Sequence, residues 1–372
     1  MRHALGLNER LGTLHSHLRR VVPSVDRLAV ALYDPGMDQL KTFVNSTVGG
    51  EPLAAYQYKL SDSPSLMALK NEGKSRVIDD ISTSLTSETE HTRWVKGMGY
   101  RSSYTVPIFH QGIFEGFLFF DSCRPSAFTP EAVRRLEIYV NLIMLMVSHE
   151  LTTVRALLGS VQVARDFTSL RDEETGAHLE RMSRFCRLIA QGMAKTHGLS
   201  DEFIEQLFLF APLHDIGKVG IPDVVLRKPG SFTPQERKTM ESHVDLGVRM
   251  VDRLIEDFDL RAVAGIGILR NLVAYHHEFL DGSGYPHGTK LGDIPIEARI
   301  VTVADIFDAL TSRRIYKEAW DIDRALATMD RMAAQGKLDV DCVAALRAGQ
   351  DKARQIIKRF GESVGKTAVA YL

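Results

Sequence analysis

The sequence predicts an N-terminal α+β domain with an antiparallel sheet, a long connecting helix and a C-terminal all-α helical bundle. A chain of 372 residues is longer than one ordinary hydrophobic core accommodates, so two domains are the first expectation. Strand-like alternation of apolar and polar residues is confined to the first 130 residues, whereas helical spacing dominates after about residue 166. The predicted boundaries are residues 1–130, 131–165 and 166–372.

The N-terminal part shows this alternation in three segments, Arg27–Asp34, Ser102–His110 and Gly112–Ser122. The last two are joined through the tripeptide His-Gln-Gly, which is typical of a tight β-hairpin. Helical spacing occurs at about residues 8–22 and 63–72. Helices mixed with hairpin-connected strands indicate an α+β fold with an antiparallel sheet.

A long helix is expected to begin at Thr129-Pro130-Glu131, where a Thr cap precedes Pro at the first helical position. From there apolar residues recur at intervals of three and four, with one position near Glu150 out of step. These residues are Leu136, Val140, Ile143, Val147, Val154, Leu158 and Val161. The stripe predicts a parallel coiled coil that joins two copies of the chain, and the alternative is an amphipathic helix lying on its own domain.

Charge and cysteine usage narrow the class of protein. The 46 Lys and Arg residues nearly balance the 47 Asp and Glu residues, which argues against a protein that coats nucleic acid or an anionic membrane. Cys123, Cys186 and Cys342 lie far apart, as expected for free thiols in a reducing cytoplasm. The longest apolar run, Tyr139–Val147, is too short to span a membrane, and the first residues lack a secretory signal. We therefore expect a cytoplasmic protein.

Seven of the 13 histidines follow residue 150, and five of those seven lie in contexts that suit metal binding. Glu174 and His178 are four residues apart, so they share one face of a helix and can hold one ion together. The full candidate set is Glu174, His178, His214, Asp215, His243, His276, His277 and Asp305. Neighbours on a helix point about 100° apart, so His276 and His277 are expected to serve different ions, or an ion and a substrate.

Five imidazoles and three carboxylates are too many for one tetrahedral zinc, and the absence of thiolates from the set excludes Cys-type structural zinc. Mixed nitrogen and oxygen donors suit a cluster of two or three iron or manganese ions, with zinc less favoured. Adjacent metals supply a hydroxide at neutral pH and positive charge on the attacking and leaving oxygens of a phosphodiester. The set therefore predicts metal-assisted attack on phosphorus.

Five segments between Arg171 and about Lys317 resemble the HD-GYP family, a subgroup of the HD-domain metal-dependent phosphohydrolases. They read RDEETGAHLERM, LHDIGKVGIPD, VLRKPGSFTPQE, HHEFLDGSGYP and ARIVTVADIFDALTSRRIYKEA. The resemblance implies hydrolysis of cyclic di-GMP to pGpG, and often onward to GMP, on a helical bundle that carries two or three iron or manganese ions. It also implies that the eight candidates are the metal ligands, and Glu174 resembles the members with three ions, so three are expected.

Further roles are implied by the same resemblance. Asp215 and Lys218 are the expected catalytic residues, with Lys218 contacting a substrate phosphate, although an exposed helix cation is the alternative for that lysine. Arg314 and Lys317 resemble residues that face phosphate and guanine, against the alternative of a solvated basic face. Tyr285 is expected to stack on or hydrogen-bond to a substrate or a neighbouring helix, and a plain packing role is the alternative.

The turn from Asp281 to Pro286 is associated in the family with protein contacts, including contacts with GGDEF-domain cyclases, and Glu278 before it is expected to orient a ligand histidine.

The N-terminal part resembles a GAF domain, through its helix, its antiparallel strands and the run GYRSSYTVPIFHQGIFEGFLFFDS. GAF domains sense small molecules or drive dimerisation, so we expect a parallel homodimer. The identity of any GAF ligand is unknown and none is assumed, and the alternative is a dimerisation module with a filled core. The NKFDE signature of cyclic-nucleotide-binding members is not found.

Two hypotheses follow. The first is a phosphodiesterase that hydrolyses cyclic di-GMP, or a related dinucleotide such as cyclic GMP-AMP, under control of the GAF-like domain. The alternative is a module that keeps metal, does not catalyse and signals through the GYP turn. An HD phosphohydrolase acting on other nucleotides is disfavoured, because the GYP turn and the RIYK stretch belong to the cyclic-dinucleotide subgroup.

Overall fold

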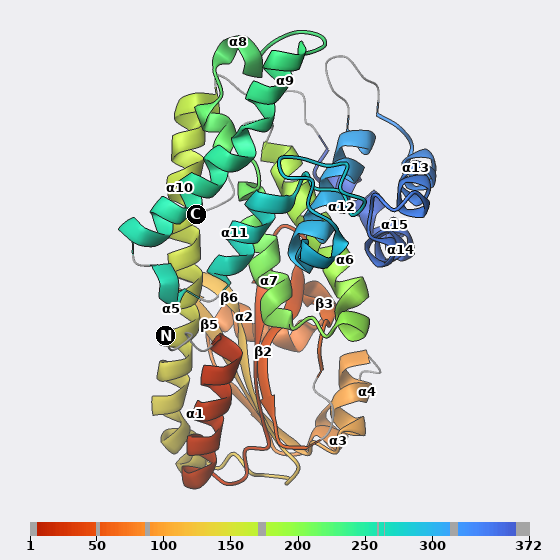
Figure 1. Ribbon diagram of the computed structural model, residues 1–372. Coiled ribbons are helices and arrows are strands. Elements are labelled where there is room, and N and C mark those ends of the chain that lie inside the picture. The colour runs from red at the N-terminus through yellow and green to blue at the C-terminus, as the bar shows by residue number, and fades with distance from the viewer. Residues whose placement is uncertain are drawn as a thin grey trace. The chain divides into compact units, whose positions relative to one another are not determined.

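The computed structural model describes residues 6–49, 53–85, 90–169, 176–258, 260–263, 265–312 and 319–361 (Figure 1). The chain divides into two compact units. The first comprises residues up to 152 together with 200–202, and the second comprises residues 153–199 and those from 203 onward. The first unit is α+β and the second is helical, as predicted.

The first unit is built on a six-stranded sheet of order β3-β2-β1-β6-β5-β4, in which the neighbouring strands pair antiparallel. The strands are β1 (Arg27–Asp34), β2 (Gln39–Thr47), β3 (Gln57–Lys59), β4 (Arg76–Ile78), β5 (Ser102–His110) and β6 (Ile113–Ser122). The three predicted strands are confirmed as β1, β5 and β6. The hairpin between β5 and β6 turns at Gln111 and Gly112, which both have positive φ, as a two-residue hairpin loop requires.

Helices complete the first unit. They are α1 (Leu7–Val21), α2 (Pro64–Glu72), α3 (Ile81–Ser84) and α4 (Glu90–Gly97), with a short 3-10 turn, η1 (Leu60–Asp62). The two predicted helices are confirmed as α1 and α2. Phe117 and Phe120 of β6 are fully buried, so the sheet has packed side chains on both faces. One ion pair, Arg27 with Asp121, is also buried between β1 and β6.

The helix α5 (Pro130–Ser169) begins at the predicted proline. Leu136, Val140, Ile143, Val147 and Val154 of the predicted stripe are buried by the chain itself. This part of the stripe is therefore not available to a second helix, and the alternative of an amphipathic helix lying on its own chain holds for it. The side chains of Leu158 and Val161 are not among those that the structure describes.

A different apolar face of α5 is exposed. Ile138 and Leu145 are 63% and 67% exposed, and Leu142 between them is 41% exposed. Their spacing of four and three residues is that of a coiled-coil seam. The periodicity of α5 therefore predicts two stripes, of which the sequence analysis selected the internal one.

The second unit consists of helices and 3-10 turns. They are α6 (Gly176–His197), α7 (Asp201–Phe210), η2 (Ala211–Leu213), η3 (Ile216–Gly220), α8 (Asp223–Leu226), α9 (Pro234–Glu241), α10 (His243–Asp257), η4 (Leu260–Ala262), α11 (Ile266–Tyr275), η5 (Leu291–Asp293), α12 (Ile296–Thr311), α13 (Ile322–Ala334), α14 (Val340–Ala348) and α15 (Gln350–Arg359). The predicted start of α9 is confirmed, because Thr233 and Glu236 form a capping box. Within the described ranges, β structure here is limited to one isolated bridge between Asp281 and Lys290.

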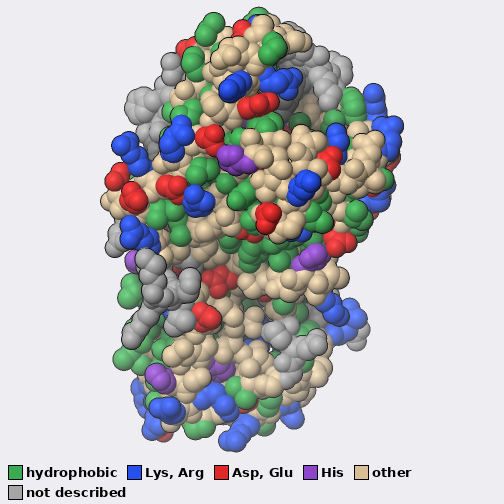
Figure 2. Space-filling model, in the orientation of Figure 1, with side chains coloured by type: hydrophobic (Ala, Val, Ile, Leu, Met, Phe, Trp, Pro, Cys, Tyr) green, Lys and Arg blue, Asp and Glu red, His purple; other side chains and the backbone are tan. Residues whose placement is uncertain are grey.

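On the face drawn in Figure 2, Lys and Arg side chains lie among Asp and Glu side chains rather than apart from them. This mixture agrees with the near balance of charges in the sequence. No helix in the described part of the chain is sufficiently long and apolar to cross a membrane.

Candidate metal centre

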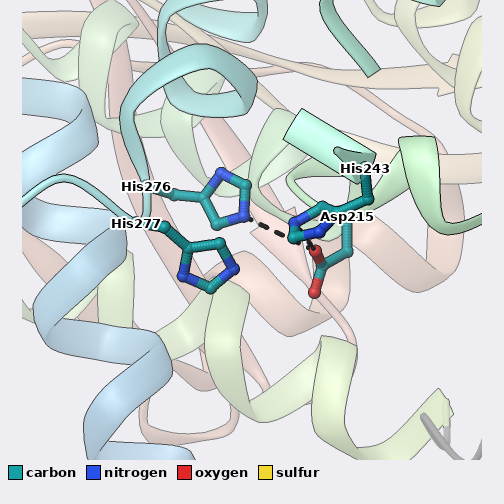
Figure 3. Close-up of side chains that lie close together, drawn as sticks. All are labelled: Asp215, His243, His276 and His277. Atoms are coloured by element: carbon teal, nitrogen blue, oxygen red, sulfur yellow. Dashed lines mark ion pairs between the residues drawn. The ribbon is translucent and has the colours of Figure 1, made fainter. Parts of the chain in front are cut away.

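Seven of the eight predicted ligands lie in two groups in the second unit. Asp215, His243, His276 and His277 form the first group, and His178, His214 and Asp305 form the second. Within each group, one potential ligand atom per residue lies within 4.8 Å of the others. Figure 3 shows the first group, in which the side chains converge from three separate stretches of the chain. The eighth predicted ligand, Glu174, lies outside the described residues.

Close packing of backbones brings the first group together. Asp215 lies directly before η3, and His243 is the first residue of α10. A Cβ on Gly217 would lie 1.8 Å from the backbone oxygen of His243, so only glycine allows the η3 turn to approach the start of α10. The glycine of the HDIGK segment therefore sets the position of Asp215 relative to His243.

The carboxylate of Asp215 lies between the two groups. Its Oδ1 is 3.0 Å from Nε2 of His243 and 3.5 Å from Nε2 of His276, both of the first group. Its Oδ2 is 3.1 Å from Nε2 of His214, of the second group, and 2.8 Å from Nζ of Lys218. Each oxygen thus faces a different group, which is the arrangement of a bridging carboxylate.

The environment keeps Asp215 ionised. Burial favours the neutral acid, but the positive charge of Lys218, 2.8 Å away, opposes it, and the pKa of Asp215 is held well below its usual range. Lys218, the predicted phosphate-binding lysine, is thus placed against Asp215. The carboxylate is in its metal-binding form at neutral pH.

Backbone carbonyls fix the tautomers of three histidines. Nδ1 of His214 lies 2.9 Å from the Ala211 oxygen, Nδ1 of His243 lies 2.7 Å from the Met240 oxygen, and Nδ1 of His276 lies 3.0 Å from the Leu272 oxygen. A carbonyl oxygen only accepts hydrogen bonds, so in each neutral ring Nδ1 carries the proton and Nε2 carries a lone pair. This is the arrangement by which proteins orient histidine ligands of metals.

The lone pairs on His243 and His276 then face a negative charge. Both Nε2 atoms are buried without a hydrogen bond, and both point at Oδ1 of Asp215. Lone pairs directed at a carboxylate oxygen repel it, unless a cation lies among them. The donor set of nitrogen and oxygen atoms therefore fits a metal ion.

His276 and His277 do not diverge as neighbours on a helix would, which was the ground for expecting separate ions, or an ion and a substrate. The helix α11 ends at Tyr275, so the two histidines follow the helix instead of continuing it, and their ring centroids are 4.1 Å apart. Both belong to the first group. Burial lowers the pKa of both rings, and for His277 the neighbouring His276 adds to this effect. Both imidazoles are therefore neutral, as metal ligation requires.

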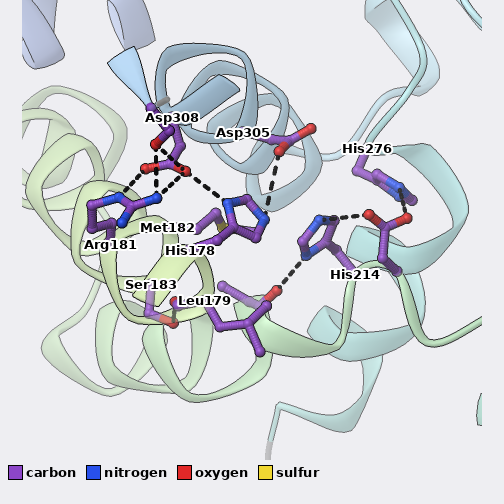
Figure 4. A network of polar contacts seen from close by, with 12 residues as sticks. His178, Leu179, Arg181, Met182, Ser183, His214, His276, Asp305 and Asp308 are labelled. Carbon is purple, nitrogen blue, oxygen red and sulfur yellow. Dashed lines mark hydrogen bonds and ion pairs between the residues drawn. The ribbon is translucent and has the colours of Figure 1, made fainter. Parts of the chain in front are cut away.

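The second group lies between α6, α12 and the stretch before Asp215 (Figure 4). Nε2 of His178 is 4.0 Å from Oδ1 of Asp305, and the rings of His178 and His214 are 5.9 Å apart between centroids. Nδ1 of His178 donates a hydrogen bond of 2.7 Å to Oδ2 of Asp308. Since Nδ1 carries the proton, Nε2 is the ring atom that can take part in ligation.

The GYP turn lies against the first group. The ring of Tyr285 stacks on that of His277, with centroids 4.5 Å apart and planes at 29°. Glu278 accepts hydrogen bonds from the backbone N–H groups of His287 and Thr289, so it shapes the turn instead of orienting a ligand histidine. Arg314 and Lys317, the other predicted substrate contacts, lie outside the described residues.

The sequence analysis missed two residues of this centre, Arg181 and Asp308. Asp308 is 1% exposed and accepts hydrogen bonds from both His178 and Arg181. Burial favours its neutral form, but the contacts with His178 and Arg181 outweigh burial and lower its pKa. Helical spacing was a usable signal, because Arg181 lies three residues after His178 and Asp308 three residues after Asp305.

Comparison with known families agrees with this geometry. Residues 163–342, which include the two groups, match the HD domain family, and residues 10–147 match the GAF domain family. The chain contains a GAF domain and an HD domain. The first unit is accordingly the GAF unit and the second the HD unit.

Three curated relatives show what similar proteins do. The cyclic di-GMP phosphodiesterase response regulator RpfG of Xanthomonas campestris is 43% identical over 200 residues, 54% of this chain and 50% of the relative. A probable cyclic di-GMP phosphodiesterase of Vibrio cholerae is 45% identical over 161 residues, 42% of this chain and 36% of the relative. The 3'3'-cGAMP-specific phosphodiesterase 2 of the same organism is 39% identical over 150 residues, 40% of this chain and 27% of the relative. The chain thus spans half or less of the length of each of these relatives.

Proposed function

We propose that this GAF–HD protein is a metal-dependent phosphodiesterase that hydrolyses cyclic di-GMP to pGpG, GMP or both. The observation that carries the proposal is the pair of buried Nε2 lone pairs, on His243 and His276, that face the ionised carboxylate of Asp215. A cation among these atoms would remove the repulsion between the lone pairs and the carboxylate. The names of the relatives supply the substrate class, a cyclic dinucleotide.

In this proposal, adjacent metal ions supply a hydroxide at neutral pH and offset the negative charge that develops on phosphorus-bound oxygens. The chain supplies the geometry. Asp215 offers one oxygen to each ligand group, and the backbone carbonyls hold the imidazoles of His214, His243 and His276 in the ligating tautomer. Lys218 lies 2.8 Å from Asp215, where its ammonium group can stabilise a substrate phosphate that reaches the site.

We further propose that the ions are iron or manganese and that Glu174 adds a ligand for a third ion. The donors of the two described groups are imidazoles and carboxylates, which these metals accept. Arg314, Lys317 and Tyr285 are proposed to contact the substrate. Tyr285 can do so only beside His277, because its ring stacks on that imidazole.

The GAF domain is proposed to regulate the HD domain in a homodimer, with a small-molecule ligand of unknown identity. The exposed seam of Ile138, Leu142 and Leu145 on α5 supports dimerisation, because apolar side chains at this spacing pack against a second helix. The proposed domain boundaries remain residues 1–130, 131–165 and 166–372. The turn from Asp281 to Pro286 is proposed as a contact for GGDEF-domain proteins.

The proposal is tested by incubating the metal-replete chain with cyclic di-GMP or with 3'3'-cGAMP, and separating the products by chromatography. Wild type is expected to convert cyclic di-GMP to pGpG or GMP, whereas His243→Gln is expected to lose turnover at least 100-fold, because it removes a proposed metal ligand. Asp252→Asn, on an exposed residue of α10, is the control and is expected to retain full activity. Binding of the dinucleotide without any turnover would favour the alternative of a non-catalytic sensor.

A further inference from the structure

Arg181 of α6 makes four hydrogen bonds from a fully buried guanidinium. Its Nε and Nη2 donate to the two oxygens of Asp308 at 2.6 and 3.0 Å. Nη2 also donates to Oγ of Ser312 at 2.7 Å, and Nη1 donates to the backbone oxygen of Phe360 at 2.9 Å. A bidentate pair of this kind fixes the orientation of the carboxylate more firmly than a single bond does.

Asp308 passes this orientation on to a candidate metal ligand. Its Oδ2 accepts from Nδ1 of His178 at 2.7 Å and from Oγ of Ser312 at 3.0 Å. Because His178 donates through Nδ1, its Nε2 is left to face Asp305 and His214 (Figure 4). The rotamer of Asp308 therefore determines both the tautomer and the direction of the His178 ring.

The other two partners of Arg181 lie at the ends of helices. Ser312 follows the last residue of α12, the helix that carries Asp305 and Asp308. Phe360 follows the last residue of α15, and its ring also lies 4.1 Å below the guanidinium of Arg184. Arg181 thus joins the ends of two helices to the ligand group that contains His178.

We propose that Arg181 is a positioning residue for the second ligand group: it holds Asp308 so that His178 presents Nε2 to the metal, and it makes this geometry depend on the seating of α15. The inference rests on the proposed metal centre. Arg181 does not touch the reacting atoms, so its effect is expected on metal affinity in the second group, with the first group left intact. Partners of this kind change metal affinity by about 10- to 100-fold when they are replaced.

The test is the binding of Mn²⁺ to the full chain over a range of buffered free Mn²⁺ concentrations, measured as metal per chain. Arg181→Lys keeps the positive charge but removes the bidentate geometry. It is expected to weaken one Mn²⁺ site by about 10- to 100-fold and leave the tighter binding unchanged. Arg187→Lys is the matched control, because Arg187 is an equally buried arginine of α6 that pairs with Glu205. It is expected to bind Mn²⁺ as wild type does.

Asp308→Asn is the second variant, in case Arg181→Lys does not fold, and the same selective weakening is expected because the amide has one acceptor fewer. Circular dichroism of each metal-free variant separates loss of metal affinity from loss of fold. Wild-type affinity in the folded Arg181 and Asp308 variants would overturn the positioning role alone. Equal loss in Arg187→Lys would also overturn it, since the effect would then be general packing. A wild type that binds no Mn²⁺ would instead refute the proposed metal centre.

Discussion

Replacing Asp215 by Asn is expected to abolish the stabilisation of the HD domain by metal while leaving the metal-free domain nearly as stable. In the metal-free wild type, the carboxylate faces the lone pairs of His243 and His276 at 3.0 and 3.5 Å. An Asn amide can donate to one of these nitrogens, and such a hydrogen bond contributes about 0.5–1.5 kcal/mol. Lys218 loses the negative charge that faces it, but the Lys218 side chain is 20% exposed and its ammonium group can be hydrated. The two effects oppose each other, so the net change is expected within about 1 kcal/mol.

Metal binding adds a larger contribution that the variant should lack. A ligand present at 1,000 times its Kd stabilises the folded state by about 4 kcal/mol. For a domain of this size, 1 kcal/mol corresponds to about 2–4 °C in Tm, so wild type is expected to gain about 8–16 °C on addition of Mn²⁺. Differential scanning calorimetry, with chelator and with Mn²⁺, measures both quantities. Asp252→Asn should gain as much as wild type, and an equal gain in Asp215→Asn would refute the role assigned to this carboxylate.

Three further predictions concern other parts of the molecule. Burial lowers the pKa of His276 and His277, so below about pH 6.5 the unfolded metal-free chain binds protons that the folded chain does not. The free energy of unfolding should therefore fall as the pH falls, by up to about 1.4 kcal/mol per pH unit for each ring. Urea titrations between pH 7 and 6 test this, and no decline would contradict it. Tyr285→Ala removes the ring stacked on His277 and should lower kcat more than Tyr285→Phe, which keeps the ring, whereas equal rates would assign no role to stacking. Leu145→Glu should convert a dimer to monomers in sedimentation velocity, and a dimer that persists would place the interface elsewhere.

The strands β1, β5 and β6 were predictable from the alternation of apolar and polar residues in the sequence, although both faces of the sheet carry buried side chains. The strand β2 was missed for a physical reason. It carries one extra residue, Phe43, between the partners of Val30 and Ala31, so Phe43 and Val44 are buried side by side. Lys41 is also buried next to Leu40, because it pairs with Asp34, and the alternation is lost. The strands β3 and β4 are only three residues long and carry too little pattern to detect. In α5, the sequence indicated an apolar stripe, but which stripe faces solvent depends on the tertiary structure.

The candidate site was predictable as a set of residues and less so as a geometry. His276 and His277 were expected to diverge because the helix was assumed to continue, whereas α11 ends one residue before them. Arg181 and Asp308 were missed because a charged residue on a helix is usually solvated, and only packing reveals that both are buried. Motif spacing therefore identified residues that the structure brings together, and the contacts that orient these residues required the structure.

The central claim is that the two groups around Asp215 hold metal ions. Anomalous X-ray scattering, recorded at the manganese absorption edge from crystals of the Mn²⁺-loaded chain, tests it most directly. One peak is expected among Asp215, His243, His276 and His277, and a second among His178, His214 and Asp305. A map with no peak at either group, from protein shown to be folded and exposed to Mn²⁺, would contradict it.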